Sequence, residues 1–312
     1  MVTLPPPVDL DPRARSSAGV RDYLSLSKPG ITGLIVAVAI AGYFLANPNP
    51  VNWVVLGILV VTGAAASAGA AMLNHYLDRD VDAQMRRTRR RPLPTARIDP
   101  SGSVAILGLL LLGGGIAAAS IFINLWTGFS IFLGGLTYVV VYTLWLKRRS
   151  SWNIVIGGFA GSAPALAGGA AAVGGWTWGV IAFAVLVFLW TPPHFWSLAI
   201  MLREDYERAG LPMLPNMQDP AYSGRVVVVS AALLIPAALL VGATGVLAWP
   251  VLVVLVALGV LFVLLTLPLW RDPRPKTARR GFIYSGPYLL MVIIAIVVNF
   301  PLLRLGVPAF SL

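Results

Sequence analysis

Two carboxylates and an amide recur every fourth residue in the segment 74–82, where a long apolar stretch ends. At this spacing Asn74, Asp78 and Asp82 share one face of a helix. Carboxylates four residues apart on a helix repel each other by about 0.2–0.5 kcal/mol, so the pattern is costly unless a cation lies between them. Carboxylate oxygens suit Mg²⁺, and the spacing therefore predicts a divalent metal site.

Arginines follow this acidic segment closely, with five of them within residues 86–91. Arginine binds phosphate oxygens through charge-assisted hydrogen bonds. Carboxylates for Mg²⁺ and arginines for phosphate, both at the edge of an apolar segment, indicate a diphosphate substrate with a lipid tail. Asp80 lies off the face shared by the other acids, and we expect it to pair with an arginine.

A second acidic segment contains Glu204, Asp205 and Glu207 and follows a later apolar stretch. Both acidic segments lie in loops longer than a turn between helices requires, which makes them candidates for function. Four predicted helices separate the two loops. This offset suggests two related halves whose acidic loops face each other across a central cavity.

The composition is too apolar for a soluble domain. Of the 312 residues, 58% are hydrophobic and 11% are charged, and the mean hydropathy is +0.82. Nine apolar runs are long enough to cross a hydrocarbon core about 30 Å thick. We therefore predict an all-α polytopic membrane protein with nine transmembrane helices around a central cavity, at residues 28–46, 51–73, 104–123, 126–146, 154–173, 178–201, 226–248, 251–270 and 284–303.

The basic residues support this count, because 22 of the 23 Lys and Arg residues fall on one side of the predicted membrane and only Arg304 falls on the other. The positive-inside rule then places the N-terminus inside and the C-terminus outside. Topology and anionic lipid account for most of the net charge of +11, and no nucleic-acid partner is expected. The chain has no cysteine, so catalysis must use other groups.

Residues 1–27 lack the apolar core of a signal peptide and are expected to form a disordered cytoplasmic tail. Residues 28–308 are expected to form a single transmembrane domain. Glycine and alanine dominate the runs 63–71 and 157–169, which predicts close helix packing. Pro164 and the pair Pro192-Pro193 can kink or break the spans that contain them.

Together these motifs resemble the UbiA-type intramembrane prenyltransferases. Asn74, Asp78 and Asp82, followed by Arg91-Pro92-Leu93, are similar to the first signature of that family. The segments 190–196 and 204–215 are similar to its heme-farnesylating members. The resemblance covers nearly the whole chain, including residues 27–30 and 142–155. One departure is that Asp205 has Met201 and Ala209 four residues away, where many members have a second aspartate.

The resemblance implies transfer of a farnesyl group from farnesyl diphosphate to a vinyl group of heme b, which gives heme O. It implies Mg²⁺ as cofactor, with Asp78, Asp82 and Asp205 as its ligands and as catalytic residues. It also implies a location in the bacterial plasma (inner) membrane, with the active-site loops on the cytoplasmic side. A heme A synthase or an assembly partner of a respiratory oxidase would be the protein partner.

Within this resemblance the expected diphosphate-binding residues are Lys28, Asn74, Arg91 and Lys147, and the expected substrate pocket contains Tyr142, Asn153, His194 and Trp196. Aromatic faces can stabilise an allylic cation, although an interfacial aromatic belt is the commoner role. His194 can ligate the heme iron, contact a propionate, or be a hydrogen-bonded structural histidine. Other expected aromatic lining residues are Tyr138, Trp145, Trp190 and Phe195.

Other functions remain open on the sequence. A secondary transporter would explain many spans and broken helices, but transporters place ionisable groups near the bilayer midplane, at a cost of at least ~2.5–3.5 kcal/mol each. The predicted spans are almost free of charge at their centres, which favours chemistry at the interface. A noncatalytic assembly factor would not need aspartates at helical spacing. Among enzymes, other prenyl acceptors such as hydroxybenzoate or chlorophyllide remain possible.

Overall fold

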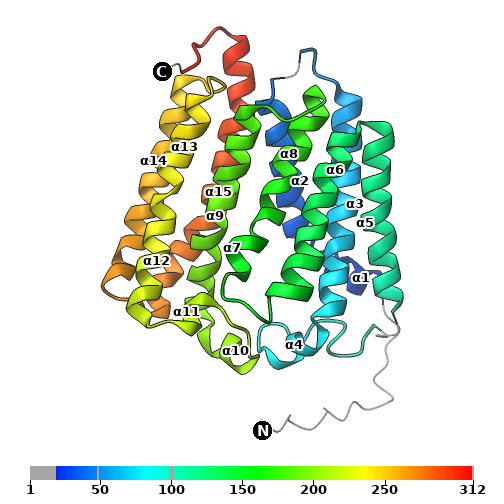
Figure 1. Cartoon of the computed structure of the whole chain (residues 1–312), viewed down its shortest axis with the longest axis vertical. Helices are drawn as coiled ribbons and strands as arrows, with labels where there is room; N and C mark the ends of the chain where they lie inside the picture. The colour runs from blue at the N-terminus through cyan, green and yellow to red at the C-terminus, as the bar shows by residue number, and fades with distance from the viewer. Residues whose placement is uncertain (1–18, 48, 99–101, 311–312) are drawn as a thin grey trace.

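The computed structural model describes residues 19–47, 49–98 and 102–310. Helices account for most of them, and the long helices run side by side along the long axis of one bundle (Figure 1). Segment η2 is π-helical and η3 is a 3₁₀-helix. In chain order the elements are α1 (Val20–Leu26), α2 (Pro29–Leu45), α3 (Trp53–Leu77), α4 (Arg79–Gln84), α5 (Ser103–Phe122), α6 (Leu125–Leu136), η2 (Thr137–Leu146), α7 (Asn153–Gly157), α8 (Phe159–Val173), α9 (Trp178–Met201), α10 (Arg203–Arg208), α11 (Leu214–Met217), α12 (Pro220–Ala232), α13 (Leu234–Ala243), α14 (Trp249–Thr266), η3 (Leu267–Trp270) and α15 (Pro275–Arg304).

The predicted number of membrane spans is confirmed within the described residues. Eight helices there are long and apolar enough to cross a bilayer, and the pair α1 and α2, bent by 49°, makes a ninth if it is counted as one span. The long apolar run from residue 226 to 270 divides as predicted. Helix α13 ends at Ala243, and α14 begins at Trp249 with Pro250 in its first turn, where the missing N–H of proline costs nothing.

Helix α1 corrects part of the expected disordered tail. Residues 1–18 lie outside the described residues, but Val20–Leu26 is helical. Leu26 is fully buried in an apolar cluster with Met72 and Leu93, and this burial favours an ordered segment. The chain then turns at Lys28, whose φ of 48° is in the left-handed region, and enters α2.

Glycine allows close helix packing, as the small-residue runs predicted. A Cβ atom on Gly168 of α8 would lie 1.9 Å from the carbonyl oxygen of Ala39 on α2. At the same crossing, a Cβ on Gly42 would lie 2.3 Å from the carbonyl oxygen of Ala165. Helices α8 and α9 continue through Pro164 and Pro192-Pro193, so neither span breaks at its prolines.

The two acidic loops lie at the same end of the bundle, where α4 and α10 are found at the bottom of Figure 1. Val81 and Met85 from the first loop share a buried apolar cluster with Tyr206, Leu211 and Met213 from the second. The backbone N–H of Arg87 also donates to Asp205 Oδ2 at 3.3 Å. The two acidic loops therefore meet, as predicted, but in direct contact rather than across a cavity, and the relation between two halves stays a prediction.

Candidate active site

The first acidic face forms where α3 ends and α4 begins. Asn74 lies in the last turn of α3, Asp78 lies at the junction, and Asp82 lies in α4. The backbone N–H of Asp78 donates to the Asn74 carbonyl at 2.9 Å, and that of Asp82 donates to the Asp78 carbonyl at 2.8 Å. These bonds continue helical spacing across the junction. All three side chains are buried, as a shared inward face requires.

Asp78 is the centre of a buried polar network. Its Oδ2 accepts hydrogen bonds from Asn74 Nδ2 at 2.7 Å and from Lys147 Nζ. Asn74 Oδ1 in turn accepts from Lys28 Nζ at 2.6 Å, and Asn74 Nδ2 also donates to Thr143 Oγ1 at 3.1 Å. Three of the four residues predicted to bind diphosphate are thus joined to the central carboxylate. Thr143 was not expected in the site from the sequence.

The π-helical segment η2 supplies one wall of this network. Lys147 N–H donates to the Tyr142 carbonyl at 2.8 Å, a bond that spans five residues, as in a π-helix. The hydroxyl of Tyr138 accepts from Lys28 Nζ at 2.9 Å, and the Tyr138 and Tyr142 rings stack with centroids 6.1 Å apart. π-Helical segments are rare and often mark functional sites. Here the π-helical segment and the residue that ends it supply Tyr138, Thr143 and Lys147, which lie around Asn74 and Asp78.

Asp82 is held by the arginine-rich segment that follows it. Arg91 Nη1 donates to Asp82 Oδ2 at 2.7 Å, and the hydroxyl of Thr88 donates to the Asp82 carbonyl at 2.9 Å. His75 Nδ1 lies 3.8 Å from the same Oδ2, too far for a hydrogen bond. Neither ring nitrogen of His75 has a hydrogen-bond partner among the described residues.

Asp80 bonds none of these network residues directly, as predicted from its offset, but its partner Arg148 also lies 3.9 Å from Asp78 Oδ1. The Asp80 carboxylate accepts two hydrogen bonds of 2.7 Å from Arg148. The Arg148 guanidinium lowers the pKa of the Asp80 carboxyl below its usual range. Asp80 is therefore an ionised surface partner of Arg148 at neutral pH.

Asp205 is the buried acid of the second loop. Its Oδ2 accepts from the Arg87 backbone and its Oδ1 accepts from Arg208 Nη1 at 3.4 Å. Glu207 forms a surface ion pair with Arg203 at 2.7 Å, and Glu204 is exposed. Asp205 alone among these three acids is thus buried toward the first loop.

The carboxylates fit Mg²⁺ only in part. Within residues 19–47, 49–98 and 102–310, no three acidic or histidine side chains form a group that could hold a metal ion, so Asp205 does not complete a ready-made site with Asp78 and Asp82. However, Asp78 Oδ1 is buried and accepts no hydrogen bond from a described residue. Mg²⁺ is usually bound by one or two carboxylates together with substrate phosphates and water. Asp78 and Asp82 suit that arrangement.

A mainly apolar cavity of about 300 Å³ borders the network inside the bundle. Lys28, Tyr138 and Tyr142 belong both to its lining and to the polar site described above. Ile31, which is 58% exposed, also lines it, so the cavity reaches the surface of the bundle. An anionic head group at the network could therefore continue into an apolar body within the helices.

The predicted pocket residues divide into two groups. Tyr142 and His194 line the cavity, whereas Asn153 and Trp196 do not. Asn153 is buried and donates to the Pro212 carbonyl at 3.5 Å, which ties α7 to the second loop. Trp196 follows His194 by two residues, about 200° around α9, and packs in the apolar cluster between the loops.

The further aromatic candidates also differ in position. Tyr138, Trp190 and Phe195 line the cavity. Trp145 does not, and it is 56% exposed on the outside of the bundle. An outward aromatic of this kind suits the interfacial belt, the alternative role considered for these residues.

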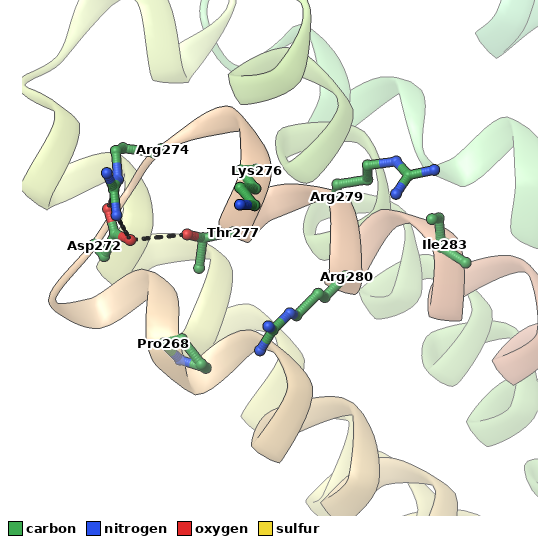
Figure 2. A pocket seen from close by; sticks show the side chains of 8 residues that line it. All are labelled: Pro268, Asp272, Arg274, Lys276, Thr277, Arg279, Arg280 and Ile283. Atoms are coloured by element: carbon green, nitrogen blue, oxygen red, sulfur yellow. Dashed lines mark hydrogen bonds and ion pairs between the residues drawn. The ribbon is translucent and has the colours of Figure 1, made fainter.

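A second cavity, of about 400 Å³, lies where η3 turns into α15 (Figure 2). Asp272, the acid in its lining, is paired with Arg274 through bonds of 2.5 and 2.7 Å. None of the predicted site residues lines this cavity. Its position and chemistry separate it from the network around Asp78. The lining residues are Pro268, Asp272, Arg274, Lys276, Thr277, Arg279, Arg280 and Ile283.

A membrane helix bundle with buried carboxylates and cations beside an apolar cavity defines an intramembrane enzyme for substrates with an anionic head and an apolar body. The chain belongs to the UbiA prenyltransferase family, whose profile matches residues 35–307.

Two relatives agree with this membership. The chain is 40% identical over 281 residues to protoheme IX farnesyltransferase of Alkalilimnicola ehrlichii, covering 89% of this chain and 92% of the relative. It is 40% identical over 301 residues to the protein of the same name from Symbiobacterium thermophilum, covering 92% and 96%.

Among solved structures, one described as digeranylgeranylglyceryl phosphate synthase superposes with a TM-score of 0.75 at 18% identity, covering 90% of this chain and 98% of that one. A UbiA homolog from Archaeoglobus fulgidus bound to GPP and Mg²⁺ gives 0.67 at 16% identity, covering 89% and 99%. At these identities the structural likeness concerns the fold.

Proposed function

We propose that this chain transfers the farnesyl group of farnesyl diphosphate to a vinyl group of heme b and so produces heme O. The observation that carries the proposal is the 40% identity, over about nine-tenths of the chain, to proteins named protoheme IX farnesyltransferase. The polar network bordering an apolar cavity supports it, because the donor has a diphosphate head and an isoprenoid tail. One prenyltransferase domain over residues 28–308 would contain both parts.

The cations of the network are suited to binding the diphosphate. Lys28, Lys147 and Arg91 each hydrogen-bond a residue of the acidic face, so their positive charges converge on one end of the bundle. Ammonium and guanidinium groups bind phosphate oxygens strongly, and arginine can do so through two parallel bonds. Asn74 orients Asp78 and Lys28 with respect to each other. Asp205 supports the arginine segment through the Arg87 backbone.

Asp78 and Asp82 are the residues that would hold Mg²⁺, with Asp205 as a third candidate from the facing loop. When bound, the ion supplies positive charge that stabilises the leaving diphosphate. That a UbiA homolog from A. fulgidus was solved bound to GPP and Mg²⁺ supports the use of this ion. Oδ1 of Asp78, which accepts no hydrogen bond from a described residue and lies 3.9 Å from Arg148 Nη2, supports it independently.

In the proposed reaction the bond between farnesyl C1 and the diphosphate oxygen breaks, and its electron pair leaves with the diphosphate. Lys28, Lys147 and Arg91 stabilise the charge that develops on that group. The vinyl π electrons of heme b then form the new C–C bond to C1. Water adds to the resulting cation next to the porphyrin and loses a proton, which gives the hydroxyethylfarnesyl group. Apolar walls around the cavity protect the allylic cation from earlier attack by water.

The proposed location is the bacterial plasma (inner) membrane, and the distribution of Lys and Arg supports an orientation with the acidic loops on the cytoplasmic side. Substrate entry from within the bilayer agrees with the exposed Ile31 in the cavity lining. The product would pass to a heme A synthase or to an assembly partner of a respiratory oxidase.

The test incubates the purified chain with heme b, farnesyl diphosphate and Mg²⁺ and analyses the porphyrins by mass spectrometry. The expected product carries one farnesyl group and one hydroxyl group more than heme b. Absence of this product, together with prenylation of hydroxybenzoate or chlorophyllide in parallel incubations, would assign a different acceptor.

A further inference from the structure

His194 in the cavity lining has a hydrogen-bonding pattern that the diphosphate chemistry does not use. Its Nδ1 lies 2.6 Å from the hydroxyl oxygen of Ser285 on α15. That hydroxyl lies 2.6 Å from the backbone carbonyl oxygen of Phe282, one turn earlier in the same helix. The three groups form a short chain of hydrogen bonds from α15 to α9.

The donor and the acceptor in each of these two hydrogen bonds follow from the number of protons available. A serine hydroxyl has one proton to donate, and a carbonyl oxygen can only accept. Ser285 therefore donates its proton to Phe282, and its oxygen accepts from His194. The ring proton of His194 is then on Nδ1. In a neutral imidazole with that tautomer, Nε2 carries an unshared electron pair.

The surrounding rings fix the orientation of the imidazole. Trp190 stacks on it with centroids 4.6 Å apart and an interplanar angle of 17°, and Phe282 stacks on it at 5.2 Å and 27°. Trp190 is itself held by a 2.8 Å hydrogen bond from its Nε1 to the Ser285 carbonyl. No described residue hydrogen-bonds Nε2 of His194, although the side chain lines the cavity. The imidazole is thus a rigid group with one unused basic nitrogen.

We propose that Nε2 of His194 is an axial ligand of the heme iron of the acceptor, and that Ser285 is a positioning residue that fixes the ligating tautomer. The proposal rests on the proposed function and adds the contact that holds the porphyrin. Neutral imidazole is a common ligand of heme iron, and a hydrogen bond at its other nitrogen raises its basicity as a ligand. The bond is coordinative: Nε2 donates its electron pair to iron, and no proton or redox equivalent is transferred.

The chain offers a matched control for this ligation, because it contains two histidines and no cysteine. His75 lies on α3, with Nδ1 3.8 Å from Asp82 Oδ2, and it does not line the cavity. An iron–histidine bond in the complex of this chain with heme must therefore involve His194 or His75. Ser230 provides the control for Ser285, since its hydroxyl donates to a backbone carbonyl, that of Val227, without contacting a histidine.

The experiment records resonance Raman spectra of ferrous heme bound to the full chain in lipid nanodiscs. The iron–histidine stretching band should appear in the unmodified chain and in His75→Gln, and it should shift when histidine is labelled with ¹⁵N. It should disappear in His194→Ala and His194→Gln and return on addition of imidazole to His194→Ala. Ser285→Ala should move the band to lower frequency, and Ser230→Ala should leave it unchanged.

Persistence of the band in both His194 variants would overturn the proposal. Farnesylation of heme by the unmodified chain without an iron–histidine band would also overturn it while leaving the proposed function intact. Failure to bind or farnesylate heme at all would reject the proposed function, and the ligation with it. Circular dichroism melting of each variant identifies loss of fold, and His194→Gln keeps a polar side chain in α9 if His194→Ala is unstable.

Discussion

Asp78 is the side chain on which the other members of the polar network converge. It is 1% exposed, it accepts from both Asn74 and Lys147, and its second oxygen has no hydrogen-bond partner among the described residues. Asp80, two residues later, is paired with Arg148 at the surface. The two aspartates share a loop and a charge but differ in burial and partners, which makes them a natural pair for comparison.

Asp78→Asn should lower kcat/KM for farnesyl transfer by about 100-fold, because the amide removes one negative charge needed to bind the cation on the diphosphate. Asp80→Asn should change it by less than about threefold, since exposed ion pairs contribute little. Steady-state assays of farnesylated heme at saturating Mg²⁺ measure both. Equal losses of kcat/KM in Asp78→Asn and Asp80→Asn would show that burial of Asp78 has no catalytic consequence.

Lys28 connects the network to the cavity, because it hydrogen-bonds Asn74 and Tyr138 and also lines the apolar space. Lys28→Gln should raise KM for farnesyl diphosphate by about 10- to 100-fold, the loss expected for one charge-assisted hydrogen bond. Its KM for heme should change little. Lys276→Gln, at the second cavity, is the control and should leave both values unchanged. A larger effect on heme than on farnesyl diphosphate would place Lys28 at the acceptor instead.

Helices α2 and α8 form part of the cavity wall and pack closely because glycine lies where they cross. A methyl group on Gly168 would lie 1.9 Å from the Ala39 carbonyl oxygen, a distance that only a shift of one helix can relieve. By contrast, a methyl group on Gly33 of the same α2 would meet nothing within 4 Å. Gly168→Ala should therefore destabilise the bundle by about 1–3 kcal/mol, the usual cost of overpacking.

Gly33→Ala should be neutral or slightly stabilising, because alanine is the better helix former. Thermal unfolding of the two variants in the same detergent, followed by circular dichroism, compares them directly. A lower Tm for Gly33→Ala than for Gly168→Ala would contradict the packing argument.

The length of the apolar runs was sufficient to predict the membrane-spanning helices, and helical spacing was sufficient to predict the acidic face. Asn74, Asp78 and Asp82 share a face because their backbone bonds run at intervals of four, which sequence spacing reveals directly. The partner Thr143 could not be found this way, since it reaches Asn74 from a π-helical segment whose sequence resembles any other apolar span. The one signal in the sequence was that Thr143 lies four residues before Lys147, which was predicted to bind diphosphate.

The aromatic cluster of α9 shows a second limit of sequence reasoning. Residues 190–196 contain several rings and a histidine, and spacing alone does not say which side of α9 faces the cavity. The structure turns Trp190 and His194, four residues apart, into it and Trp196 away from it. The ordered α1 was missed for a similar reason, because its stability depends on burial of Leu26 against distant residues.

The bundle as a unit has chemically different ends. The acidic loops around α4 and α10 lie at one end, whereas α15 finishes at the opposite end, drawn in red at the top of Figure 1. The proposed orientation places the loop end, and with it the diphosphate-binding residues, on the cytoplasmic side. The absence of cysteine allows this orientation to be tested without removing native thiols.

Asp80→Cys and Leu305→Cys place one thiol at each end, on side chains that are 57% and 81% exposed in the native residues. In intact spheroplasts a membrane-impermeant maleimide should label Leu305→Cys and leave Asp80→Cys unlabelled until the membrane is opened by detergent. Labelling is read as a mass shift on a denaturing gel. The reverse pattern would place the acidic loops outside. It would also require diphosphate to be bound on the side of the membrane away from the cytoplasm, which contradicts the proposed use of a cytoplasmic donor.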